Sequence, residues 1–225
     1  MRTVSGYSMN SVVGAVGHLL LDFDGPVCAL FGGVDVSELL LRSTVQHECS
    51  PLVPLMKQYC RDPLALLRSP SVQGDPVILA AAEKIVREVE LEGARTAPRN
   101  ADLEVFLERL HQQRVPVSVV SNNSIEAVTI FKRHDSLMRE MVAFCRPESM
   151  PHLMKPSPYL VEQAIIAGGV DRGLCVLLGD SETDICAAHA AGIRAVGYAN
   201  KHGKRERLEA VGADHVIDSL LQFEA

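Results

Sequence analysis

The sequence lacks the features that mark membrane proteins and nucleic-acid-binding proteins. No apolar run reaches the roughly 18 residues that a membrane-spanning helix needs. Lysine and arginine total 22 against 28 aspartates and glutamates, which gives a net charge of −6. Binding to a phosphate backbone needs a basic face, and none is visible. Internal repeats and low-complexity segments are also missing. We therefore expect neither a nucleic-acid partner nor a membrane partner.

The six cysteines form neither a CxxC pair nor a zinc-ligand spacing. Several lie inside apolar runs, where a free thiol behaves as a small hydrophobic group. The apolar stretch from Ser11 to Leu21 lacks the charged flank and the cleavage site of a signal peptide. We predict that the cysteines are reduced core residues of a cytoplasmic protein, with residues 1–10 as a loose tail.

The 225 residues, 47% hydrophobic and 22% charged, suffice for one or two globular domains. Short apolar runs alternate with amphipathic stretches from about residue 98 onward. Strands are predicted at 18–23, 115–121, 142–145, 174–178, 194–198 and 215–217. Helices are predicted at 101–113, 125–133, 158–167, 184–191 and 204–211. This alternation predicts an α/β fold, a doubly wound parallel sheet with helices on both faces.

The strand signal disappears between residues 28 and 97. Helices are predicted there at 39–49, 52–59, 64–68 and 77–91, separated by Ser-Pro, Asp-Pro and Gly-Asp-Pro breaks. We therefore predict a core domain of residues 1–27 and 98–225, and a helical cap domain of residues 28–97 inserted after the first strand. An insertion at this point lies above the carboxyl ends of the strands, where open α/β sheets bind ligands. It is a candidate lid.

Four polar motifs follow predicted strands or precede a predicted helix. They are Asp22-Phe23-Asp24-Gly25, Ser121-Asn122-Asn123, Lys155-Pro156-Ser157-Pro158 and Gly179-Asp180-Ser181-Glu182-Thr183-Asp184. Each alone has an ordinary structural explanation: a turn, a helix N-cap, a solvated lysine or acids that complement a helix dipole. Their common placement and order instead favour a single catalytic site.

The two aspartates of the first motif point to the same side of the strand exit, because strand side chains alternate. Two carboxylates about 4 Å apart repel by about 4 kcal/mol at an effective dielectric of 20. Asp180 and Asp184 would add to this repulsion. A divalent cation together with Lys155 would offset it, so the residues themselves predict a metal site.

The ordered motifs DFDG, SN, KPSP and GDSETD resemble those of the haloacid dehalogenase (HAD) superfamily of phosphohydrolases. The resemblance is greatest to the subgroup with a helical cap after the first strand, which includes phosphoglycolate-phosphatase-like enzymes. It implies a Rossmann-like core and hydrolysis of a small-molecule phosphomonoester through an aspartyl-phosphate intermediate. Asp22 would be the nucleophile and Asp24 the general acid/base.

The resemblance also implies a Mg²⁺ ion bound by Asp22, the backbone carbonyl of Asp24, and Asp180. Lys155 would be catalytic, neutralising the nucleophile and the phosphate. Ser121 and the Asn122 backbone would bind the phosphate oxygens, and Asp184 would support the metal's waters or Lys155 from outside the ligand set.

The chain departs from the family pattern at two places. Pro26 stands where the commonest first motif has threonine, and Cys28-Ala29-Leu30 stands where an acidic residue is usual. Both catalytic acids remain, but phosphoglycolate is not assigned as the substrate. Basic residues of the insertion could contact the polar end of a substrate, but charges on helix faces usually lie in solvent; these residues are Arg42, His47, Lys57, Arg61 and Arg68. The cluster from Lys201 to Arg207 is expected to be a solvated helix start.

Three other functions fit parts of the pattern. A sugar-phosphate mutase of the same superfamily would return the phosphoryl group to a sugar. A receiver-like signalling module also uses strand-end aspartates, a hydroxyl and a lysine, but the helical insertion and the second aspartate argue against it. A non-catalytic binding protein on this scaffold would not need Asp22, Asp24, Lys155 and Asp180 together.

Overall fold

The computed structural model describes residues 15–47, 49–133 and 135–225. Its sheet is entirely parallel, with strand order β3-β2-β1-β4-β5-β6. The strands are β1 (His18–Leu21), β2 (Val117–Ser121), β3 (Ala143–Cys145), β4 (Cys175–Gly179), β5 (Arg194–Tyr198) and β6 (His215–Ile217). The predicted fold class and the six predicted strands are confirmed. The predicted N-terminal tail lies outside the described residues.

The first strand lies in the interior of the sheet, between β2 and β4, and all four of its residues are buried. It pairs with β2 on one side and β4 on the other, so that Leu20 lies beside both Ser118 and Leu177. A strand covered on both faces needs a continuous apolar run, which the leucines after His18 supply.

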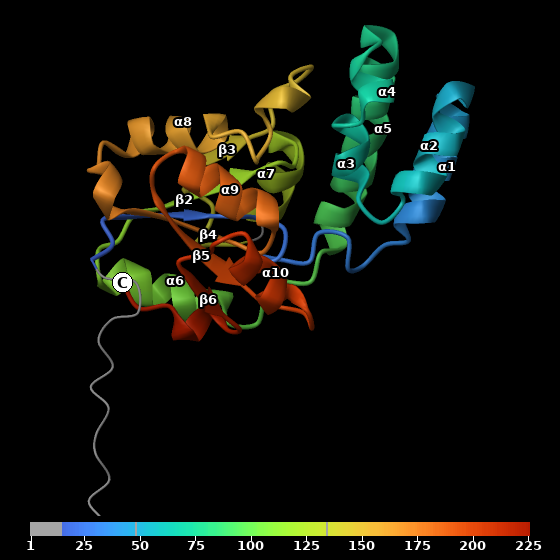
Figure 1. Ribbon diagram of the computed structural model, residues 1–225. Helices are drawn as coiled ribbons and strands as arrows, with labels where there is room; N and C mark the ends of the chain where they lie inside the picture. Colours follow the sequence, from blue (N-terminus) through green and yellow to red (C-terminus); the bar gives the residue numbers. More distant parts are fainter. Residues whose placement is uncertain (1–14, 48, 134) are drawn as a thin grey trace, which may run out of the picture.

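Helices cover both faces of the sheet (Figure 1). They are α6 (Leu103–Gln112), α7 (Ile125–Arg133), α8 (Tyr159–Gly168), α9 (Glu182–Ala190) and α10 (Lys204–Ala210). Leu19 and Leu21 pack into one apolar cluster with α6, α7 and the C-terminal Phe223. Leu20 packs into a second cluster with α8, α9 and α10. The period-two alternation of β1 thus supplies a core to each side.

Short 3₁₀ helices complete the connections. They span Ser50–Leu52, Pro151–Leu153, Arg172–Leu174 and Leu220–Gln222. In the part of the chain that the structure describes, no helix is both long and apolar enough to cross a membrane.

Between β1 and α6 the chain forms a separate group of helices, which stands beside the sheet in Figure 1. These are α1 (Val36–Gln46), α2 (Val53–Tyr59), α3 (Pro63–Leu67), α4 (Pro70–Gln73) and α5 (Pro76–Thr96). The group has its own apolar cluster, which includes Leu40, Leu66 and Val86. The short helix α4 was not predicted, and α5 extends beyond its predicted end. Side chains of Asp35, Asp62 and Asp75 cap α1, α3 and α5.

The long helix α5 returns to the core and packs against α7. Its residue Gly93 passes the backbone after β1 so closely that a Cβ atom there would lie 2.5 Å from the Leu30 carbonyl oxygen. A side chain at position 93 would therefore push the last turns of α5 away from the strand exit.

The cysteines are all free, as predicted. Cys28 and Cys175 are buried, whereas Cys186 is exposed and the other three are half-buried. The expectation that they are core residues is right for Cys28 and Cys175 and wrong for Cys186, while Cys49, Cys60 and Cys145 pack at the margins of the apolar clusters.

Candidate active site

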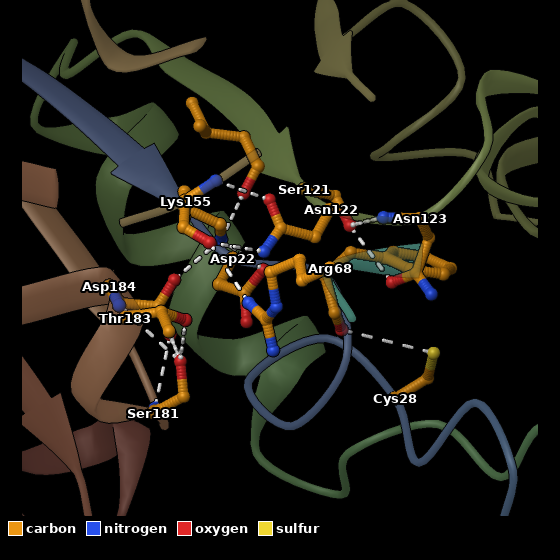
Figure 2. Close-up of polar contacts among 12 residues, drawn as sticks. Asp22, Cys28, Arg68, Ser121, Asn122, Asn123, Lys155, Ser181, Thr183 and Asp184 are labelled. Atoms are coloured by element: carbon orange, nitrogen blue, oxygen red, sulfur yellow. Dashed lines mark hydrogen bonds and ion pairs between the residues drawn. The ribbon is translucent and has the colours of Figure 1, made fainter. Parts of the chain in front are cut away.

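The topology brings the four predicted motifs to one edge of the sheet. Because β1 lies between β2 and β4, the residues that follow these three strands meet where their carboxyl ends emerge. Asp22 follows β1, Ser121 closes β2, and Asp180 follows β4. Lys155, on the segment before α8, joins them, and Figure 2 shows it between Asp22 and Asp184.

Lys155 is the buried cation at the centre of this arrangement, only 2% exposed. Its Nζ lies 2.7 Å from Asp22 Oδ1 and 2.5 Å from Asp184 Oδ1, and it donates to the Val120 carbonyl at 2.8 Å. Burial alone would lower the pKa of Lys155, but the two carboxylates more than offset this and raise the pKa above its ordinary value. The lysine is therefore charged at neutral pH.

For the carboxylates a raised pKa has the opposite meaning, because it disfavours their charged form. Burial, followed by the repulsion from Asp184, raises the pKa of Asp22 well above its ordinary value. Burial also raises the pKa of Asp180, against the attraction of Lys204. Both shifts show that negative charge is costly here, as expected where acids crowd together away from water.

This crowding fits a divalent cation. One carboxylate oxygen from each of Asp22, Asp180 and Asp184 lies within 4.8 Å of the others. Hard cations such as Mg²⁺ take oxygen ligands, and a charge of +2 would offset the burial and the repulsion that raise the pKa values of Asp22 and Asp180. The donor set therefore suits the predicted ion.

Gly25 allows Asp180 to approach the first motif. Its φ of +118° is a conformation that other residues rarely adopt, and a Cβ atom there would lie 2.3 Å from the Asp180 carboxylate. A glycine is therefore needed after the two aspartates, because the carboxylate of Asp180, which follows β4, occupies the space that a side chain at position 25 would fill.

Asp24 has an environment distinct from that of Asp22. Its Oδ1 accepts a hydrogen bond from the Leu30 backbone N–H at 2.9 Å. Burial raises the pKa of Asp24 to about 6, although that hydrogen bond opposes the shift. The two acids of the motif thus differ in their partners: Asp22 is paired with the Lys155 ammonium, whereas Asp24 is bonded to a backbone N–H.

Asp184 is fully buried, and both of its oxygens are engaged. Oδ1 faces Lys155, while Oδ2 accepts from the Ser181 backbone N–H at 3.0 Å and from its hydroxyl at 2.6 Å. Ser181 in turn caps α9. Asp184 therefore ties the start of α9 to the lysine.

The loop after β2 holds the lysine's backbone. The Asn122 side chain accepts from the Lys155 N–H at 2.7 Å and donates to the Lys155 carbonyl at 3.0 Å. The Ser121 hydroxyl is bonded to Asn123 at 2.9 Å and is fully buried. Among the described residues, Asn122 and Asn123 line the cavity beside the acids, but Ser121 does not. A phosphate contact from the Ser121 hydroxyl stays a prediction.

Two cavities open from the acid cluster. The first, of about 280 Å³, is lined by Asp22, Lys155 and Asp180 together with Arg68 of the insertion. The second, of about 420 Å³, shares Asp24 and Asp180 with the first. Its other walls come from the segment after β1, the segment after α2, the start of α9 and the segment from β5 into α10. Its basic residues are Arg61, Lys201, Lys204 and Arg207.

Two residues of this site, Asn200 and Lys204, were not identified from the sequence, whereas Arg68 was named there as a possible substrate contact. Arg68 donates to the Lys155 carbonyl at 3.1 Å, and Asn200 donates to Asp180 Oδ2 at 3.0 Å. Lys204 forms an ion pair with Asp180, and its side chain is only 14% exposed. The expectation of a solvated helix start is therefore wrong for Lys204. A signal for Asn200 existed, because it follows β5 at the edge where the other motifs meet.

Replacing Lys155 with methionine tests the central ion pairs. At pH 7.5 the Lys155→Met variant should lose about 3 to 5 kcal/mol of unfolding free energy, because two buried carboxylates lose their partner. The loss should shrink at pH 5, because Asp22, whose pKa is already raised by burial, also loses the lysine that opposes this shift and binds a proton in the folded protein. Urea denaturation at both pH values measures this. The exposed Lys84→Met is the matched control, and equal stability of the two variants would show that the pairs contribute nothing.

Comparison with known proteins agrees with this geometry. Residues 152–223 match the HAD-hydrolase-like family model. A phosphoglycolate phosphatase from Neisseria meningitidis is 32% identical over 123 residues, which are 53% of this chain and 52% of that protein. The chain thus spans about half the length of the curated relatives it matches.

Solved structures agree over a longer part of the chain. A hydrolase from Pseudomonas syringae aligns with a TM-score of 0.68 at 18% identity, covering 92% of this chain and 95% of the other. A HAD-superfamily hydrolase of subfamily IA from Geobacter sulfurreducens aligns with a TM-score of 0.57 at 18% identity, covering 94% and 96%. In sequence over its C-terminal third, and in fold over nearly its whole length, the chain resembles the HAD hydrolases, as its four motifs predicted.

Proposed function

We propose that the protein is a Mg²⁺-dependent phosphatase that hydrolyses small phosphomonoesters through a phosphorylated aspartate. The observation that carries this proposal is the cavity of about 280 Å³ in which Asp22, Asp24, Asp180 and Lys155 converge. Phosphoryl transfer needs positioning and charge neutralisation above all, and this cavity provides cations and acids in fixed places. The match to phosphoglycolate phosphatases supports the same reaction class.

Asp22 is the proposed nucleophile. Its bond to Lys155 holds one oxygen, and a carboxylate that is fixed and desolvated needs little reorganisation to attack phosphorus. In the first step a bond forms between an Asp22 oxygen and phosphorus, and the bond from phosphorus to the ester oxygen breaks. Lys155 remains charged throughout and neutralises both the attacking acid and the phosphoryl oxygens.

Asp24 is the proposed general acid and base. A pKa of about 6 leaves part of the population protonated near neutral pH, so that Asp24 can give its proton to the leaving ester oxygen. The resulting carboxylate then takes a proton from the water that attacks the phosphorylated aspartate. Asp22 is regenerated, and inorganic phosphate leaves.

The proposed metal ligands are Asp22, Asp180 and the backbone carbonyl of Asp24. When bound there, Mg²⁺ supplies positive charge to the carboxylates and to the phosphate. Asp184 is proposed to remain outside the ligand set, because its two oxygens already hold Lys155 and Ser181. The amide of Asn200 and the ammonium of Lys204 both bind Asp180 Oδ2 and so orient this carboxylate.

Residues 28–97 are proposed to act as a cap domain. Their contribution to the first cavity comes from Asp62, Leu64 and Arg68, around and within α3. The alcohol part of the ester would extend into the second cavity, whose basic residues suit acidic metabolites. Phosphoglycolate, named by the relatives, is one acidic ester of this kind and belongs among the compounds to be tested.

Asp22→Asn tests the reaction class. The wild type should release inorganic phosphate from at least one ester in a panel of glycolate, sugar, nucleoside and amino-acid monophosphates, with Mg²⁺ and without a bisphosphate. Asp22→Asn should reduce kcat below about one-thousandth, because an amide cannot act as the nucleophile. Asp218→Asn, whose side chain lines neither cavity, should keep full activity. Turnover that requires a bisphosphate would instead identify a mutase.

Removal of Mg²⁺ should abolish turnover, and its return should restore it. Calorimetry gives an independent readout of the ion. Asp180→Asn should weaken Mg²⁺ binding at least about tenfold, since a charged ligand becomes a neutral one. Activity that resists EDTA, or unchanged binding by Asp180→Asn, would contradict the assigned ligands.

Asp24→Asn separates the two proton transfers. With alkyl phosphates kcat should fall about 10²- to 10⁴-fold, because the leaving oxygen receives no proton. With 4-nitrophenyl phosphate the leaving group needs no proton, so the first turnover should persist. It should appear as a burst of nitrophenolate close to one per enzyme, followed by slow hydrolysis of phosphorylated Asp22. Rapid mixing measures the burst, and its absence in an otherwise folded variant would argue against this role.

A further inference from the structure

A buried ion pair lies directly behind the loop that follows β2. Glu90, on α5 of the insertion, is fully buried, and Arg146, just after β3, is 9% exposed. Arg146 Nη1 lies 2.8 Å from Glu90 Oε1, and Nη2 lies 3.1 Å from Oε2. This two-pronged geometry is the strong form of the arginine–carboxylate pair.

The pair also binds three consecutive residues of the loop. Arg146 donates to the Asn122 carbonyl at 2.7 Å. Glu90 accepts from the Asn123 side chain and from the Ser124 backbone N–H, both at 3.1 Å. The backbone N–H of Arg146 additionally donates to the Asn123 carbonyl at 3.3 Å. The loop is thus held from behind by side chains of two other segments.

The same loop faces the proposed phosphate cavity. Asn122 and Asn123 line it, and the Asn122 side chain fixes the backbone of Lys155. A displacement of this loop would therefore move both a wall of the cavity and the lysine. Glu90 and Arg146 themselves do not line the cavity among the described residues, so any effect they have on phosphate must pass through the loop.

We infer that Glu90 and Arg146 are positioning residues, which set the Asn122–Ser124 loop and Lys155 for phosphate binding. This inference rests on the proposed function, since it assumes that the cavity holds a phosphoryl group. Because Glu90 belongs to α5, the pair also makes the geometry of the phosphate loop depend on the docking of the insertion. A buried ion pair is weak evidence of stability. The contacts of this pair with the Asn122–Ser124 loop indicate that it positions the loop.

The double variant Glu90→Gln/Arg146→Met tests the inference. It removes both charges together, so neither is left buried alone, and the glutamine oxygen can still accept from the Ser124 N–H. In the presence of Mg²⁺ we expect the Kd for inorganic phosphate, measured by calorimetry, to rise about tenfold. We expect kcat/KM to fall about 10- to 100-fold, since small displacements of positioning groups cost that much.

Glu83→Gln is the matched control for stability. Glu83 is also a buried acid on α5, but it accepts from the Ser149 N–H instead of the loop. Its loss should lower the Tm and leave the phosphate Kd within about twofold. Arg146→Lys is a second test that keeps the charge: one ammonium cannot reproduce the fork, so the Kd should still rise, by less than in the double variant.

The outcomes separate the inference from the proposed function. If the wild type hydrolyses esters and the double variant binds phosphate and turns over as the wild type does, the inference is overturned while the function stands. If the wild type hydrolyses no ester but the double variant loses phosphate affinity, the function is overturned while the inference stands. A weakened Kd in Glu83→Gln equal to that in the double variant would show only a loss of stability, and would also overturn the inference.

Discussion

The placement of one ammonium group between two carboxylates is the constraint on which the site depends. Asp22 and Asp184 come from positions more than 150 residues apart, and both are buried. Without Lys155 their charges would repel each other in a medium that screens poorly. The lysine makes their proximity tolerable, and with it the approach of Asp180. The sheet supplies the proximity, since β2, β1 and β4 end together, but the lysine makes it electrostatically possible.

The lysine is itself held at both ends, at its backbone and at its ammonium group. Asn122 binds its backbone on both sides, Arg68 binds its carbonyl, and its ammonium is bound by two acids and the Val120 carbonyl. A side chain this long would otherwise keep much rotamer freedom. The cost of fixing it is met during folding, so it need not be met again when a ligand binds. The Lys155 side chain is in this sense preorganised for ligand binding.

Features set by local sequence patterns were predicted, whereas side-chain contacts between distant segments were not. The six strands, the insertion and the four motifs follow from apolar periodicity, turn residues and the rule that strand ends share an edge. The partnership of Asp180 with Lys204 does not, because a lysine at a helix start looks the same whether it faces water or a distant acid. The same holds for Arg68 and for Glu90, whose roles depend on how α3 and α5 dock against the core. The rule that residues at strand ends share one edge also does not predict that the Ser121 hydroxyl is buried and bonded to Asn123.

The side chains that line the two cavities differ in burial and in hydrogen bonding, and this difference bears on the proposed choice of substrate. One wall of the first is formed by Asp22, Asn122, Asn123 and Lys155, which are buried and hydrogen-bonded, so the geometry of this wall resists change. The second is lined by side chains such as Arg61, Lys201 and Arg207, which are exposed on the segment after α2 and on the segment from β5 into α10. Surface substitutions of that kind cost little stability. In the proposed phosphatase, residues around the alcohol part of the ester could therefore vary while the contacts around phosphorus stay the same, because the two depend on largely separate sets of side chains.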